Sequence, residues 1–226
     1  MRELQQTAPG GSIGSARVAT PKVRQEKPSS LRATLTRVAW LAILLGLVVE
    51  VLLVASRMGA LPFEAAVAEL VNRVSWSVIV CVGLALGDTL AEDKPLWLGL
   101  SGLATAPLAF TIARGLHKGT SELLEAKAPL ESIAPLLAGS IRGLEYMCLG
   151  LAIFWLSRRV RASAPVYIGT GLLIGLVFGL VMLALNPAVM SSMATMLVWS
   201  VNELLFPVGC ALVLFASEAL GDKLKK

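Results

Sequence analysis

Charged residues are scarce in this sequence: Asp, Glu, Lys and Arg together make up 15% of its 226 residues. A soluble domain usually carries about 25% charged residues, because its surface faces water. Since 56% of the residues are hydrophobic, the chain has too few charged side chains to cover a water-facing surface. The composition argues against a soluble enzyme, a nucleic-acid-binding domain and a secreted disulfide scaffold, and it indicates a membrane protein.

Histidine and cysteine are also rare, which limits the possible metal and cofactor sites. The single histidine, His117, cannot build a bis-histidine haem site or a histidine-rich zinc site within one chain. Cys81, Cys148 and Cys210 each lie in an apolar run, where they are expected to be small buried side chains, with a three-thiolate metal site as the alternative. No motif of a hydrolase nucleophile, a zinc protease or a nucleotide-binding loop is present. We therefore expect no enzymatic activity and no cofactor.

Six runs of the sequence are apolar enough to cross a bilayer, which takes about 20 residues. They are residues 38–56, 64–86, 96–116, 133–157, 166–185 and 193–216. The predicted fold is all-α, a polytopic membrane protein with six transmembrane helices in a compact bundle, surrounded by lipid.

The distribution of basic residues predicts the orientation of these spans. An even number of spans places both termini on one side of the membrane. Fourteen Lys and Arg residues lie on the side of the termini and four on the other side. Because cytoplasmic loops carry the excess of basic residues, we predict that both termini are cytoplasmic, in the inner (plasma) membrane of a bacterium.

The ends of the chain differ in composition from its centre. Residues 1–37 contain seven Lys or Arg, two Glu and no aromatic residue. Such a segment buries too little apolar surface to become ordered, so we predict a disordered basic cytoplasmic tail, with an organelle transit peptide as the alternative. Residues 38–220 form the membrane domain, and 221–226 a short basic cytoplasmic C-terminus. Without interleaved aromatic residues, the basic charge does not indicate nucleic-acid binding.

Three pairs of segments resemble one another in the same order along the chain. Residues 44–55, 71–73 and 85–90 match residues 173–184, 201–203 and 219–224. We predict that the first two spans and the last two spans are parallel hairpin repeats, related by an axis near the membrane normal.

Glycines have two predicted roles in the spans. Gly171, Gly175 and Gly179 follow one another at intervals of four residues, a pattern that lets a neighbouring helix approach closely. Gly87 and Gly221 follow the last apolar turns of their spans, where glycine commonly ends a helix.

Ionisable residues inside the spans are the candidates for function. Each costs about 2.5–3.5 kcal/mol at the centre of a membrane helix, so it is expected to face the bundle interior. The candidates are Glu50, Arg73, Arg142, Glu145 and Glu203, to which Asn72 and Asn202 add amide groups at matching repeat positions. They come from the first, second, fourth and sixth spans and lie near the midplane, so we predict that they share one polar centre.

Local spacing indicates that some of these charges are paired. Glu69 and Arg73 are four residues apart, and Arg142 and Glu145 are three apart, so each pair shares a helix face. Pro207 cannot donate a backbone hydrogen bond, which frees the carbonyl of Glu203 four residues earlier.

Two functions agree with this polar centre. The first is binding and translocation of a small polar or charged solute or ion, with the arginines holding anionic groups and the glutamates holding cationic groups or protons. The second is a non-transporting membrane subunit that scaffolds a larger complex, in which the charges are structural ion pairs. A second copy of the chain or another membrane subunit is the partner that either function allows. In size and in its polar centre the chain resembles the membrane-embedded binding subunits of vitamin-type importers, which implies solute binding between helices.

Overall fold

The structure is a computed structural model that describes residues 28–56, 62–90, 94–126, 134–159 and 163–224. These residues form six long α-helices and one short 3-10 helix, without any strand among them. The helices are α1 (Pro28–Ser56), α2 (Phe63–Leu90), α3 (Pro95–Leu123), α4 (Pro135–Arg159), α5 (Ala164–Leu185), η1 (Pro187–Ser191) and α6 (Met193–Leu224). All six α-helices contain a stretch long and apolar enough to span a membrane, so the predicted all-α six-span fold is confirmed for the described residues.

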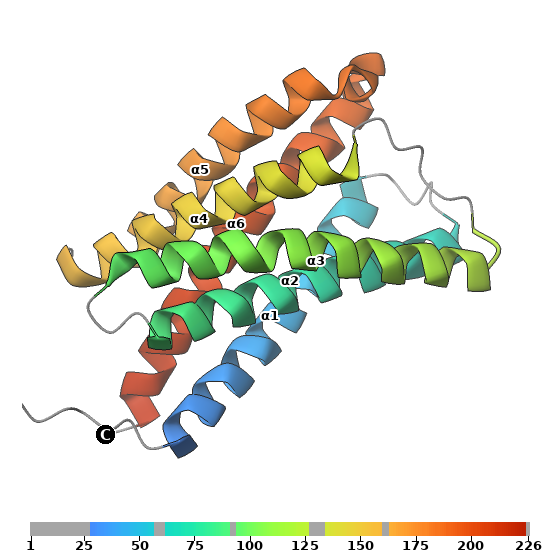
Figure 1. The fold of residues 1–226 in the computed structure, drawn as a ribbon. Helices are drawn as coiled ribbons and strands as arrows, with labels where there is room; N and C mark the ends of the chain where they lie inside the picture. Colours follow the sequence, from blue (N-terminus) through green and yellow to red (C-terminus); the bar gives the residue numbers. More distant parts are fainter. Residues whose placement is uncertain (1–27, 57–61, 91–93, 127–133, 160–162, 225–226) are drawn as a thin grey trace, which may run out of the picture.

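The helices pack in chain order around the bundle (Figure 1). Each α-helix contacts the next one along the chain, and α6 returns to contact α1. In addition α6 contacts both α2 and α4 across the bundle. Half of the apolar stretch of α4 and of α6 is buried, against 22% in α5. The even-numbered helices therefore form the inner part of the bundle.

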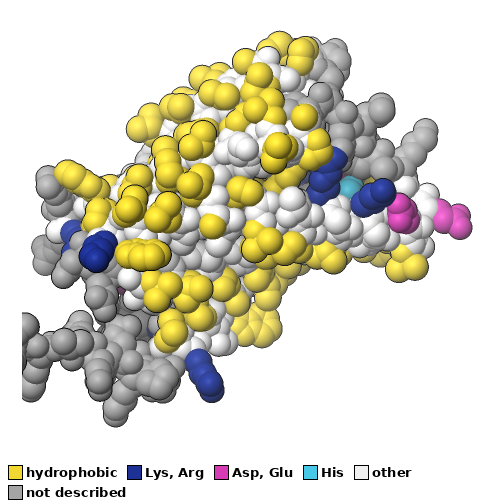
Figure 2. Space-filling model, in the orientation of Figure 1, with side chains coloured by type: hydrophobic (Ala, Val, Ile, Leu, Met, Phe, Trp, Pro, Cys, Tyr) yellow, Lys and Arg dark blue, Asp and Glu magenta, His cyan; other side chains and the backbone are white. Residues whose placement is uncertain are grey.

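The core lies where α2, α4 and α6 meet, and the outer surface is apolar. Leu84 of α2, Leu149 of α4 and Cys210 of α6 are fully buried in one hydrophobic cluster. Figure 2 shows hydrophobic side chains spread over the visible face, with the coloured charged side chains gathered toward its ends. Exposed leucines and valines on nearly every helix give the surface that a lipid environment requires. The chain is accordingly an integral membrane protein.

The first helix starts earlier than the sequence indicates. It begins at Pro28, so residues 28–37, part of the predicted disordered tail, are helical. Leu35 packs against the core cluster, and the side chain of Arg37 donates to the carbonyl of Ala33 and the hydroxyl of Thr34. These contacts stabilise the helical turns that precede residue 38, where the predicted span begins. Residues 1–27 lie outside the described residues.

The prediction that Gly87 and Gly221 end their helices is wrong. The helix continues past Gly87 to Leu90 and past Gly221 to Leu224. A Cβ atom on Gly87 would lie 1.9 Å from the hydroxyl oxygen of Ser101 on α3. Gly87 is therefore a packing residue, which lets α2 and α3 approach closely.

The glycine stripe on α5 has the predicted role. A Cβ atom on Gly171 would lie 2.6 Å from the Cα atom of Val208, and one on Gly175 would lie 3.2 Å from the carbonyl oxygen of Glu203. The missing side chains allow α5 to lie directly on the backbone of α6. The hairpin repeats stay a prediction.

Candidate functional site

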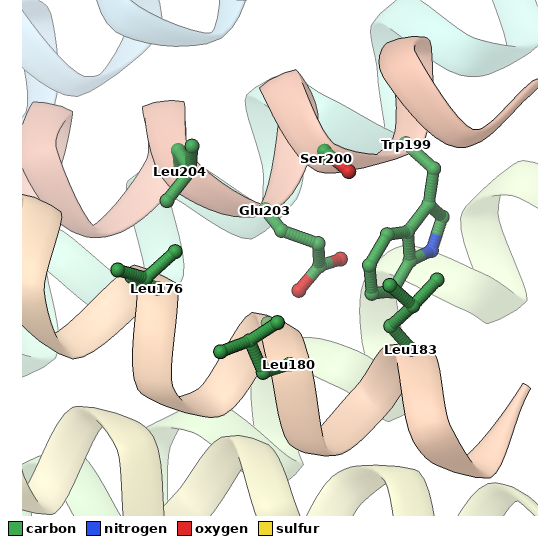
Figure 3. Close-up of a pocket in the computed structure, with 9 residues that line it drawn as sticks. Leu176, Leu180, Leu183, Trp199, Ser200, Glu203 and Leu204 are labelled. Carbon is green, nitrogen blue, oxygen red and sulfur yellow. The ribbon is translucent and has the colours of Figure 1, made fainter. Parts of the chain in front are cut away.

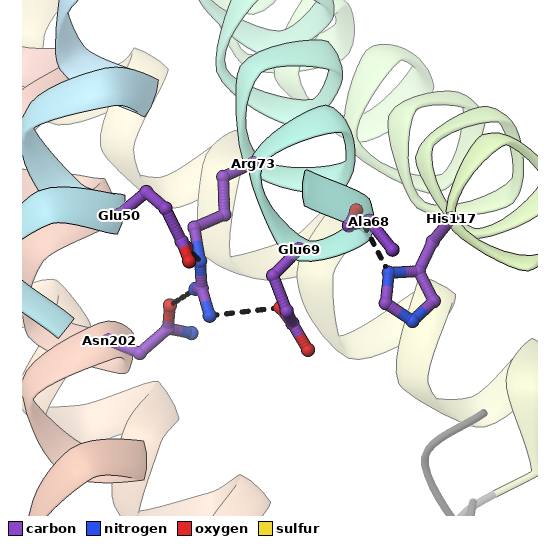
Figure 4. Close-up of polar contacts among 6 residues, drawn as sticks. All are labelled: Glu50, Ala68, Glu69, Arg73, His117 and Asn202. Atoms are coloured by element: carbon purple, nitrogen blue, oxygen red, sulfur yellow. Dashed lines mark hydrogen bonds and ion pairs between the residues drawn. The ribbon is translucent and has the colours of Figure 1, made fainter. Parts of the chain in front are cut away.

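Arg73 of α2 forms the first polar cluster, together with Glu50, Glu69 and Asn202. Its Nε atom donates to Oε2 of Glu50 on α1, and its Nη1 atom donates to the side-chain oxygen of Asn202 on α6. Its Nη2 atom donates to Oε2 of Glu69 at 3.0 Å, one turn earlier on α2. Figure 4 shows the guanidinium between these three side chains. This Arg73 cluster connects three helices through one buried group.

Arg142 of α4 forms the second cluster with Glu145 and Glu203. Its Nη1 atom donates to Oε2 of Glu145 at 2.7 Å, and its Nη2 atom donates to Oε1 of Glu203 on α6. Glu145 is fully buried and Glu203 is 4% exposed. The Arg142 cluster thus ties α4 to α6 inside the bundle.

Both clusters lie at a similar depth, in the half of the bundle where α2, α4 and α6 begin. Arg73 lies ten residues after Phe63, Arg142 seven after Pro135, and Glu203 ten after Met193. At a rise of 1.5 Å per residue, these distances correspond to about 10–15 Å from the helix starts. Where the membrane midplane lies relative to this depth stays a prediction.

The two clusters contain more carboxylates than guanidinium groups. In these two clusters, four glutamates pair with two arginines. Three carboxylate oxygens, Oε1 of Glu50, Oε1 of Glu145 and Oε2 of Glu203, are buried without a hydrogen-bond partner among the described residues. A buried charged oxygen without a donor is costly. The centre is therefore one positive charge short in each cluster when all its groups are ionised.

A small cavity adjoins the Arg142 cluster between α5 and α6 (Figure 3). Its volume is about 50 Å³. The lining residues are Gly175, Leu176, Gly179, Leu180, Leu183, Trp199, Ser200, Glu203 and Leu204. Leu176 and Leu180 are exposed on the outer surface, so the cavity lies beside the lipid-facing side of the bundle. It has room for a few water molecules, but not for a ligand that needs the usual ~300–1,000 Å³.

An aromatic and apolar layer separates the clusters from the other half of the bundle. The ring of Trp76 lies 5.9 Å from that of Tyr146 and 6.4 Å from that of Phe110, both in edge-on geometry. Beyond these rings, Val80 and Leu149 are completely buried. The polar centre is therefore closed toward the end of the bundle where α1 begins.

Six of the seven predicted site residues take part in the two clusters. They are Glu50, Arg73 and Asn202 in the first cluster and Arg142, Glu145 and Glu203 in the second. Asn72 is the exception, because none of the hydrogen bonds of the two clusters in the described part of the chain includes it. These residues form two clusters, which meet α6 at the consecutive residues Asn202 and Glu203. That they act as one polar centre stays a prediction.

The predicted site lacked one residue of the Arg73 cluster and two residues that line the cavity. Glu69 binds Arg73, and its spacing of four residues from Arg73 was the signal that could have included it. Trp199 and Ser200 line the cavity, but single apolar and hydroxyl side chains in an apolar run carry no such signal.

The predicted alternative of a three-thiolate metal site is wrong for the described residues, which contain no group of three His, Cys, Asp or Glu side chains able to hold a metal ion. Cys81 and Cys210 lie together, with their sulfur atoms 3.2 Å apart. His117 lies away from both clusters, and its Nδ1 atom donates to the backbone carbonyl of Ala68 at 3.1 Å (Figure 4). This hydrogen bond joins the C-terminal part of α3 to the N-terminal part of α2.

Comparison with known proteins adds no assignment. No family model, no curated protein and no solved structure matches the chain.

Proposed function

We propose that this membrane protein binds and translocates a small cation through the polar centre formed by the Arg73 and Arg142 clusters. The carboxylate excess carries the proposal: three buried carboxylate oxygens have no donor among the described residues. A cation would supply the missing positive charge at these oxygens, which burial otherwise makes costly.

The occupancy of the two arginines argues against an anionic solute. Arg73 already binds two carboxylates and an amide, and Arg142 binds two carboxylates. An anion would have to displace one of these carboxylates and enter a region with excess negative charge. The initial hypothesis that the arginines hold anionic groups is therefore the less favourable one. The volume of the cavity, about 50 Å³, also argues against a vitamin-sized solute.

Translocation would require the closed half of the bundle to open, and α6 is the helix best placed to do this. It contributes Asn202 to one cluster and Glu203 to the other. Pro207 lies inside α6, where it cannot donate to the carbonyl of Glu203, and prolines are common positions of helix bending. Bending there would move both cluster residues relative to the apolar layer.

A non-transporting scaffold subunit is the second candidate, and a specific observation favours it. Arg73 joins side chains of α1, α2 and α6, and Arg142 joins side chains of α4 and α6, so both clusters hold separate helices together. Ion pairs of this kind can determine which helices meet without binding any solute.

Flux measurements on proteoliposomes test the proposal. The purified protein is reconstituted, a membrane potential is imposed, and uptake is measured for protons, alkali cations and small ammonium ions. We expect uptake of one of these cations above that of protein-free vesicles, reduced at least tenfold by Glu145→Gln. Glu122→Gln, at an exposed position near the end of α3, is the matched control and should transport as the unmodified protein does. Absence of uptake for the whole panel would contradict the proposal.

A neutral replacement of the Arg142 cluster separates the two candidate functions. Because Arg142 binds both Glu145 and Glu203, all three must change, and we suggest R142M, E145L and E203L together. A neutral packed core can match a buried ion pair in stability, so this variant should fold with a melting temperature near that of the unmodified protein. Transport predicts that its cation uptake is lost. If the triple variant takes up cations as fast as the unmodified protein, the Arg142 cluster has a structural role and no role in transport.

A further inference from the structure

We propose that the translocated cation is a proton, carried on Oε2 of Glu203 and exchanged through the cavity between α5 and α6. This inference rests on the proposed cation translocation and names its substrate. It concerns Glu203, a carboxylate of the Arg142 cluster that also lines the cavity between α5 and α6.

The two oxygens of the Glu203 carboxylate have different surroundings. Oε1 accepts a hydrogen bond from Arg142, whereas Oε2 is buried without a partner among the described residues. The side chain is 4% exposed and points from α6 toward α5 in Figure 3. A proton on Oε2 leaves the bond from Arg142 in place and turns the orphaned acceptor into a donor. That donor can bind water, for which the cavity has room.

The chemistry of the cavity lining favours a proton over a metal ion. Metal cations such as Mg²⁺ and Ca²⁺ need about six or more oxygen ligands. Besides Glu203, Ser200 is the one lining residue with a side-chain oxygen, since the others are Gly, Leu and Trp. A proton needs only the carboxylate oxygen itself. An amine with an apolar tail would exceed the volume of about 50 Å³.

The charges around Glu203 also favour one added proton. From α4 it faces Arg142, which pairs with Glu145 as well, and Tyr146 lies beside Glu145. With both carboxylates ionised the cluster has one negative charge in excess, and a single proton on Glu203 removes it.

Among the described residues, the other helices packed against α6 add no titratable group to the hydrogen-bonded set of Arg142, Glu145 and Glu203. The titratable side chain of α5, Tyr167, packs on Phe215, away from the cavity. From α2, Arg73 binds Asn202 of α6, while Glu50 and Glu69 bind Arg73. Arg37 of α1 lies beside Gly221, near the opposite end of α6. Arg142 binds Glu203 directly, and Glu145 shares that arginine with it.

Carbodiimide labelling of the full chain in proteoliposomes tests the proposal. The apolar reagent dicyclohexylcarbodiimide enters lipid and reacts with protonated carboxyl groups. The carboxylate oxygen adds to the central carbon of the reagent while the acid proton moves to its nitrogen. The adduct then rearranges to an N-acylurea without a leaving group, so the peptide gains the mass of one reagent molecule. A water-soluble carbodiimide, which does not enter lipid, is the comparison reagent.

We expect the apolar reagent to label Glu203, more at low than at high pH, and to block proton uptake measured with an entrapped pH-sensitive dye. The water-soluble reagent should leave Glu203 unlabelled. Glu203→Gln keeps an acceptor for Arg142 and should lose the label, whereas Glu145→Gln should keep it. Peptide mass spectrometry locates the label in the unmodified chain, so the test does not depend on the folding of a variant.

The remaining outcomes separate this inference from the proposed function. An unlabelled Glu203, or a label on Glu145 instead, would overturn the proton site, even if another cation is taken up. A labelled Glu203 in vesicles that take up no cation would overturn translocation itself, and with it the assignment of the proton as substrate.

Discussion

Asn202 and Glu203, consecutive residues of α6, bind the arginines of the two clusters: Asn202 accepts from Arg73 and Glu203 from Arg142. Consecutive residues of a helix point about 100° apart, because 3.6 residues complete a turn. α6 therefore separates the two clusters and contacts both. Any rotation or bending of α6 must alter both sets of ion pairs together, which couples the two clusters mechanically.

Removing the arginine of the first cluster should be strongly destabilising. Arg73→Met leaves the buried carboxylate of Glu50 without its cation, and breaking a buried pair costs about 3–5 kcal/mol. We expect a large drop in the melting temperature of the purified protein in detergent. The control is Lys118→Met, because Lys118 pairs with Glu122 at the surface, with side chains 74% and 69% exposed, and such pairs contribute about 0–1 kcal/mol. Equal melting temperatures for the two variants would contradict the structural role of Arg73.

Two glycines of α3 should respond to alanine in opposite directions. A Cβ atom on Gly102 would lie 2.2 Å from the backbone oxygen of Tyr146 on α4, so Gly102→Ala forces the helices apart. Overpacking of this kind costs about 1–3 kcal/mol or more. Gly119 has no neighbouring atom within 4 Å of the added Cβ, so Gly119→Ala should gain up to about 1 kcal/mol from helix propensity. Thermal unfolding of both variants in one detergent checks the prediction, and a stable Gly102→Ala protein would contradict the α3–α4 packing.

The contact between α2 and α6 should be open to chemical cross-linking. The sulfur atoms of Cys81 and Cys210 lie 3.2 Å apart, and a disulfide requires about 2.05 Å. The membrane-permeable oxidant diamide should join them by taking one hydrogen from each thiol. After denaturation, a polyethylene-glycol maleimide should then add to Cys148 alone, and to no residue in Cys148→Ser. Three reactive thiols after oxidation would show that α2 and α6 do not meet as described.

Topology remains a prediction that labelling can test. In a cysteine-free background, Glu122→Cys should react with an impermeant maleimide added to intact cells. Leu90→Cys should react only after the membrane is opened, and a reporter fused after Lys226 should be active in the cytoplasm. All these expectations follow from the excess of basic residues on the side of the termini. The reverse labelling pattern would invert the bundle and place both termini outside.

The number and type of spans were determined by the sequence alone. Crossing a bilayer requires about 20 consecutive apolar residues. This is a local property of the sequence, so it can be recognised without knowing which helices are neighbours. The same holds for Glu69 with Arg73 and for Arg142 with Glu145, since residues three or four apart on a helix share a face. The cost of burying charge in lipid also predicted that the remaining ionisable groups would turn inward.

The partners of these groups were decided only by the tertiary structure. Glu50 with Arg73, Asn202 with Arg73, and Glu203 with Arg142 are 23, 129 and 61 residues apart, so their contacts depend on which helices pack together and how each is rotated. Rotation also excludes Asn72, which points about 100° away from Arg73 on the same helix. In the same way Gly87 could not be recognised as a packing residue until α3 was placed beside it. The cavity at Glu203 exists because the glycine stripe brings α5 onto α6, a relationship between two surfaces that no single segment encodes.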